Sequence, residues 1–144
     1  MKTVDFLSRN LGRSTAKWCS SVYIDYDGIA YSYGRHYPLA VIIDGEAYIN
    51  ARGYSNSTSR HISWATSAAG RIVGPNHVHK IDLIGTTFDR VAITASAEAK
   101  IKELDIIIAS KKRKDTSVYL DLQRQRKAAL DALYSIVESN YKGK

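Results

Sequence analysis

The segment SSVYIDYDGIAYSYGRHYPLAVIIDGEAYIN, residues 20–50, decides the fold. At its start, Val22 and Ile24 alternate with Tyr23 and Asp25, which is the two-residue period of a β-strand. The dipeptides at 27–28 and 44–45 are both Asp-Gly, a strong hairpin signal because both residue types tolerate positive φ. They help to connect four predicted strands, at residues 20–27, 29–33, 39–43 and 46–50. The segment therefore predicts an antiparallel β-meander.

Helical patterns flank the meander on both sides. Residues 3–12 predict a short helix that Thr3 caps and Gly12 ends. Residues 58–69 predict a second helix, because apolar side chains recur at near-helical spacing after several N-cap residues. Residues 78–84 are predicted to be one more strand or an extended segment.

The last third of the chain has the pattern of a helical hairpin. From about Ala95, apolar side chains form one stripe before a basic interruption and a second stripe after it. The two helices are expected to be antiparallel, with Asp115 or Thr116 capping the second. The predicted class is α+β: a small antiparallel β-meander of about four to five strands, packed on one face against helices, with a C-terminal α-helical hairpin.

Length and composition fit one domain over residues 1–144, with a sheet-rich layer in 1–93 and the hairpin layer in 94–144. Cys19 is the single cysteine, which excludes an intramolecular disulfide and a cysteine-based zinc site. No apolar run is long enough to span a membrane, and the first residues lack an export signal. We therefore expect no membrane partner and a cytoplasmic location.

The net charge of +7 is unevenly distributed along the chain. Residues 1–99 contain 10 basic and 8 acidic side chains, whereas residues 100–144 contain 11 basic and 6 acidic ones. A small basic protein is suited to an anionic partner, either nucleic acid or an acidic protein surface. The positive charge excludes mimicry of DNA.

The densest charge is the run Lys111-Lys112-Arg113-Lys114. Four adjacent cations repel one another, so they are expected in solvent or against a partner. On nucleic acid they would hold the phosphate backbone without reading bases. The alternative is that they complement a helix C-terminus and keep the turn soluble.

The least generic stretch is Tyr31–Ala40, in which Arg35 and His36 lie among tyrosines. Aromatic faces beside a guanidinium can stack unpaired bases and hold phosphates. The same composition suits a protein interface, and tyrosines also suit any half-buried pleated surface. The predicted binding residues are Tyr33, Arg35, His36, Tyr37, Arg52, Tyr54, Arg60, Lys111, Lys112, Arg113, Lys114 and Arg124.

This stretch resembles small phage-encoded proteins that carry a Tyr-Gly-x-His-x-Pro-x-Ala segment. In those proteins the segment precedes an Asn-containing strand and a Thr-x-x-His helix start, as YSYGRHYPLA here precedes Tyr48-Ile49-Asn50 and Thr58-Ser59-Arg60-His61. The resemblance covers residues 22–64. It implies a phage origin, and hence the cytoplasm of a bacterial host, rather than a particular chemistry. Many small phage proteins occupy nucleic acid or disable a host enzyme.

Two groups of histidines could support chemistry. His36 and His61 each follow an arginine, Arg35 and Arg60, and such a set could cleave RNA without a metal. His77 and His79 would lie on one face of a strand and could bind a metal, with Asp82, His36 or His61 as a third ligand. Exposed loop histidines explain the same pattern. There is no clear acidic cluster and no cysteine beside these histidines, so no metal is predicted. There is also no phosphate-binding or dinucleotide-binding glycine motif, so no cofactor is predicted.

Three functions follow from these patterns. The first is a phage accessory protein that binds nucleic acid without catalysis. The second is an inhibitor that docks on an acidic host protein, and the third is a metal-independent nuclease. A homo-oligomer is also plausible on sequence grounds, because the meander leaves sheet edges and the last helix offers a coiled-coil-like seam.

Overall fold

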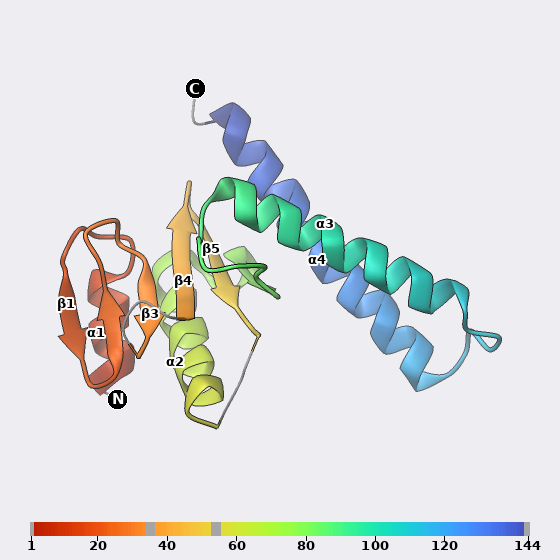
Figure 1. Cartoon of the computed structure of the whole chain (residues 1–144), viewed down its shortest axis with the longest axis horizontal. Coiled ribbons are helices and arrows are strands. Elements are labelled where there is room, and N and C mark those ends of the chain that lie inside the picture. Colours follow the sequence, from red (N-terminus) through yellow and green to blue (C-terminus); the bar gives the residue numbers. More distant parts are fainter. Residues whose placement is uncertain (1, 34–36, 53–55, 143–144) are drawn as a thin grey trace.

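The computed structural model describes residues 2–33, 37–52 and 56–142, and the side chains of 56–57 and 140–142 lie outside the description. A six-stranded sheet and four α-helices make up this part of the chain (Figure 1). The elements are α1 (Lys2–Asn10), β1 (Lys17–Cys19), β2 (Val22–Ile24), β3 (Ala30–Ser32), β4 (Tyr37–Ile43), β5 (Glu46–Asn50), α2 (Asn56–Val73), the 3₁₀ helix η1 (Pro75–His77), β6 (Val78–Ile81), α3 (Arg90–Ala109) and α4 (Ser117–Lys142).

The strands lie in the sheet in chain order, from β1 to β6. Strands β1 to β5 are antiparallel to their neighbours, which confirms the predicted meander and the α+β class. Strand β6 is parallel to β5, because α2 carries the chain back to the end of the sheet at which β5 begins. The sequence patterns predict neither β1 nor this parallel pairing.

Local turn chemistry explains where the strands end. The Asp25 carboxylate accepts hydrogen bonds from the backbone N–H groups of Asp27 and Ile29, at 2.9 and 3.0 Å, so the predicted strand over 20–27 stops at Ile24. The second hairpin has the predicted tight turn, since Asp44 and Gly45 both have positive φ.

Helices cover both faces of the sheet, so the expectation of helices on one face is wrong. Ala47 and Ile49 belong to the core cluster that α1 and α2 cover, whereas Tyr48 between them belongs to the cluster that α3 and α4 cover. Successive side chains of a strand point to opposite faces. Because β5 is apolar on both faces, it needs a helical layer on each.

The C-terminal helices form the predicted hairpin. Helix α3 begins at Arg90, earlier than the predicted Ala95, because the Asp89 side chain caps it by accepting from the N–H of Ala92. Thr116 caps α4, as one of the two predicted alternatives. Figure 1 shows the connection between the helices at the end of the molecule remote from the sheet. We call residues 111–116, which form this connection, the hairpin tip.

Helix α1 differs from the prediction at its start. It begins at Lys2, so Thr3 lies inside the helix and the predicted Thr3 cap is wrong. Its apolar face is as expected, because Leu7 and Leu11 are buried against the sheet. Gly12 follows in the left-handed region, at φ +83°. Over the described ranges, no helix combines the length and the apolar character that a bilayer crossing requires.

Two glycines hold the end of α1 against the first hairpin. The N–H of Gly12 donates to the carbonyl oxygen of Gly28 at 2.9 Å, and a Cβ on Gly28 would lie 2.6 Å from the carbonyl carbon of Gly12. Gly28 and Gly45 have φ values of +80° and +78°, but a Cβ on Gly45 would meet no atom within 4 Å.

We predict that Gly28→Ala is much more destabilising than Gly45→Ala. Both substitutions place a Cβ in the left-handed region, at a cost of about 1–2 kcal/mol. Only Gly28→Ala also forces two backbone segments apart, which adds about 1–3 kcal/mol. Urea unfolding of both variants measures the difference. Equal free energies of unfolding would contradict the close packing of Gly28 on Gly12.

Candidate functional site

Three aromatic side chains form a row across β1, β2 and β3. Trp18 lies opposite Tyr23, and Tyr23 lies opposite Tyr31. The ring centroids are 4.8 Å apart for Trp18 and Tyr23, and 6.5 Å apart for Tyr23 and Tyr31. We call Trp18, Tyr23 and Tyr31 the aromatic ladder.

The ladder lies on the face of the sheet opposite α1 and α2. Val22 and Ile24 flank Tyr23 and point into the core beneath those helices, so Tyr23 points the other way. Helices α3 and α4 pack on that second face, but their core cluster draws its strand residues from β4, β5 and β6. Trp18 is 58% exposed as a result, and Tyr23 and Tyr31 are partly exposed.

The ladder residues are absent from the predicted binding set, although the sequence contains a signal for them. Tyr23 and Tyr31 are equally distant from Asp27, so a hairpin centred on that residue places them opposite each other. Trp18 joins the row only through β1, which no pattern predicts.

The predicted tyrosines of the meander have different surroundings. Tyr33 is 52% exposed and its ring centroid lies 5.0 Å from that of His61. Tyr37 is buried, and its hydroxyl lies within hydrogen-bond distance of the carbonyl oxygens of Asn50 (3.0 Å) and Arg52. Tyr33 therefore offers a ring face to solvent, whereas Tyr37 holds the end of β5.

His61 is enclosed by hydroxyl groups. Its Nε2 lies 3.1 Å from the Ser21 hydroxyl and its Nδ1 lies 2.5 Å from the Ser32 hydroxyl. Burial first, and then the charge of Arg60, lower the pKa of His61 below its usual value. A buried imidazole with both nitrogens occupied is not placed to exchange protons with a substrate in this conformation.

The predicted cations lie in separate places. Arg52 and Arg60 are exposed, on either side of the segment that leads from β5 into α2. Arg124 is exposed on α4. The run 111–114 lies at the hairpin tip, remote from β1 to β3 (Figure 1). Arg35, His36 and Tyr54 lie outside the described residues.

The hairpin tip is well solvated. Three of its four cations are exposed, and Lys111 is partly exposed. Arg113 lies 3.7 Å from the Asp115 carboxylate, and both side chains are more than three-quarters exposed. Within the described ranges, no ion pair forms with the lysines of the tip. Their charge is therefore directed to solvent rather than to the fold.

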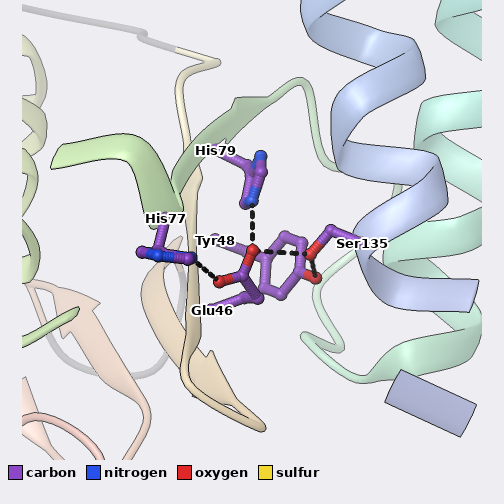
Figure 2. A network of polar contacts seen from close by, with 5 residues as sticks. All are labelled: Glu46, Tyr48, His77, His79 and Ser135. Carbon is purple, nitrogen blue, oxygen red and sulfur yellow. Dashed lines mark hydrogen bonds and ion pairs between the residues drawn. The ribbon is translucent and has the colours of Figure 1, made fainter. Parts of the chain in front are cut away.

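A second polar cluster joins β5, η1, β6 and α4. Figure 2 shows the Glu46 carboxylate between His77 and His79, with Ser135 on a third side. Oε2 of Glu46 lies 2.5 Å from Nδ1 of His77, and Oε1 lies 3.1 Å from Nε2 of His79. The Ser135 hydroxyl donates to Oε1 at 3.2 Å, and the Tyr48 hydroxyl lies 2.6 Å from Ser135. We call these five residues the carboxylate–histidine cluster.

The protonation states in this cluster follow from its contacts. Burial alone would raise the pKa of Glu46, but hydrogen bonds from His79 and His77 lower it overall, so the carboxylate is ionised at neutral pH. An ionised carboxylate only accepts, so both imidazoles donate to it. Burial raises the pKa of Tyr48 to about 12. Because Ser135 donates to Glu46, Tyr48 donates to Ser135.

His77 is the more exposed of the two histidines in the cluster. His77 donates through Nδ1, and its side chain is 55% exposed. His77 and Glu46 line a cavity of about 370 Å³ with Asp44, Ser135, Glu138 and Ser139. A carboxylate-oriented imidazole can accept a proton. In the described part of the chain, no three His, Cys, Asp or Glu side chains have the arrangement of a metal site.

A comparison of the chain with known proteins finds no matching protein-family model, no matching curated protein and no matching solved structure. The resemblance of residues 22–64 to phage proteins therefore stays a prediction. The argument for function depends on the geometry of the described residues.

We predict that Glu46→Gln lowers the stability of the protein at neutral pH but not at acidic pH. The loss of charge-assisted hydrogen bonds should lower the free energy of unfolding at pH 7 by about 1–2 kcal/mol. The effect is modest because part of the side chain remains in solvent. The folded-state pKa is below the ordinary value of 4.5, so the stabilisation is complete above pH 4.5 and is lost as the pH falls through the folded-state pKa.

Urea unfolding at pH 7 and at steps between pH 5 and pH 3 measures this difference. Glu98→Gln is the matched control, because Glu98 is exposed on α3 and the change removes the same charge. A constant difference between wild type and Glu46→Gln over the whole pH range would contradict an ionised Glu46 in the cluster.

Proposed function

We propose that this protein binds single-stranded nucleic acid without catalysis, by stacking bases on the aromatic ladder. The supporting observation is a row of three aromatic rings on a sheet face that the helices leave open. Proteins that bind unpaired strands use such rows, because every base has a face that stacks on an aromatic ring. We therefore expect the affinity to depend little on the base sequence of the nucleic acid.

Two further observations support a negatively charged ligand. The net charge is +7, and Arg13 and Lys17, which precede Trp18 in the chain, are exposed. The hairpin tip adds four cations at the opposite end of the molecule (Figure 1). The tip would hold the phosphates of a long strand as a second contact rather than share one site with the ladder.

The alternative of a metal-independent nuclease receives no such support. The predicted catalytic pair is His36 and His61, of which His61 is buried between two serine hydroxyls and His36 lies outside the described residues. Nucleic-acid binding needs only exposed rings and cations.

We predict that Trp18→Ala weakens binding of a fluorescein-labelled 12-nucleotide oligo(dT). One lost stacking contact is worth about 1–3 kcal/mol, which is roughly a 5- to 150-fold rise in Kd. Tyr26→Ala is the matched control, since Tyr26 is 71% exposed near the turn of the same hairpin and forms no ring contact with the ladder rings. Fluorescence anisotropy measures both. Equal Kd values for wild type and Trp18→Ala would refute the proposed platform.

We predict that replacing all four cations at 111–114 by alanine reduces the salt dependence of binding to a 40-nucleotide single strand. Each lost phosphate contact lowers the slope of log Kd against log salt by about 0.7. The control replaces Lys2, Arg9, Lys102 and Lys127, which are also exposed but belong to neither the ladder nor the tip, and should leave the slope unchanged. If the tip variant keeps the slope of the wild type, the tip is not a phosphate contact.

A further inference from the structure

The last strand of the sheet has a free edge. Strand β6 pairs with β5 on one side, and the described residues place no strand on the other. In a parallel pair, alternate residues direct their backbone N–H and C=O groups away from the partner. The outer edge of β6 therefore presents unpaired backbone groups, which is the template that an added strand needs.

Three adjoining cavities run along this edge. The first, of about 570 Å³, shares Thr66, Pro75 and Val78 with the second, of about 430 Å³. The second shares Lys80 and Ala128 with the third, of about 250 Å³. We call this series of cavities the edge groove.

The lining residues place the middle cavity of the groove, of about 430 Å³, beyond the edge rather than on a face of the sheet. Thr66 belongs to α2, which covers one face, and Ala128 and Asp131 belong to α4, which covers the other. A cavity lined by both helices lies at the strand edge between them. The helices leave room there because the wall residues are small, with Ser67 and Gly70 on α2 and Ala128 on α4.

We propose that the edge groove binds an extended peptide of a partner protein, which adds a strand to β6. The exposed backbone groups of an edge strand are complementary to another extended backbone. The helices α2 and α4 flank the edge of β6 on both sides. One extended chain can therefore reach the edge, whereas the sheet of a second folded protein would collide with α2 and α4. This binding is separate from the nucleic-acid binding proposed above.

The two sides of the groove also determine which alternation of side chains a bound peptide should have. His79 and Ile81 point to the face of α3 and α4, so Val78 and Lys80 point to the face of α1 and α2. An added strand alternates in the same way. On the face of α3 and α4, the cavity of about 250 Å³ is lined largely by apolar atoms. A cavity of ~150 Å³ already accommodates benzene, so an apolar side chain of the peptide fits here.

The face of α1 and α2 favours an acidic residue of the peptide. Lys80 is the exposed cation of β6, and in the described ranges no ion pair neutralises it. An extended segment with alternating apolar and acidic side chains fits both faces.

Fluorescence polarisation with three labelled peptides tests this proposal on the full-length protein. The first alternates leucine and glutamate over seven residues, the second replaces each glutamate by lysine, and the third is the first peptide with alternate backbone nitrogens methylated. We expect the first to bind at least tenfold more tightly than the others, because the second reverses the charge and the third removes backbone donors. No binding of the first peptide, or equal binding of the methylated one, would overturn the proposal.

A pair of tryptophan variants locates the binding. Ala128→Trp fills the groove from an exposed position on α4, whereas Val118→Trp adds the same side chain to an exposed position on that helix at its other end. Affinity should fall at least tenfold in Ala128→Trp and stay unchanged in Val118→Trp. Should both variants bind like the wild type, the peptide lies elsewhere and the assignment fails.

Sedimentation velocity separates a peptide from a second copy of the chain. We expect a monomer at 50 μM in the absence of peptide, with or without Ala128→Trp. A dimer that Ala128→Trp dissociates would make the occupant a second copy and overturn the proposal. Oligo(dT) should not displace the peptide, because the ladder and the groove lie on different strands.

Discussion

The burial of β5 on both faces is the constraint on which the rest of the structure depends. Tyr48 is fully buried beneath α4, while its neighbours Ala47 and Ile49 are fully buried beneath α2. A strand of this kind is unstable without two helical layers, since each uncovered apolar side chain costs about 1.5–3 kcal/mol. The carboxylate–histidine cluster begins at Glu46, the first residue of the same strand. Its hydrogen bonds join both halves of the chain where the layers meet.

Much of the fold follows from local chemistry and was predictable. The Asp44-Gly45 turn fixes the second hairpin because both residues adopt positive φ, whereas at 27–28 only Gly28 does and the first hairpin has a longer connection, over residues 25–29. The apolar stripes after Ala95 fix a helical hairpin in the same local way. Strand β1 escaped prediction because Lys17-Trp18-Cys19 is too short to show a period. The parallel pairing of β6 and the second helical layer depend on contacts between distant segments, which no local pattern records.

The candidate sites also differ in how far local sequence patterns predict them. The exposed charge of 111–114 follows from mutual repulsion, so its position in solvent was predictable. The aromatic ladder needed the register of three strands, although the symmetry of Tyr23 and Tyr31 about Asp27 contains part of it. The cluster around Glu46 was beyond prediction, because Ser135 is 89 residues away in sequence and only the packing of α4 on β5 brings it there.

The helical hairpin separates its tip from the part of the molecule that determines folding. Beyond Ala97, α3 packs mainly on α4, and Leu104 is the one later residue of α3 that is buried. Substitutions at 111–116 therefore change little of the packing on which the sheet depends. This leaves the tip free to change in length and charge while the core sequence stays the same. Such a fold can acquire new partners at its tip by surface mutations alone, at little risk to its ability to fold.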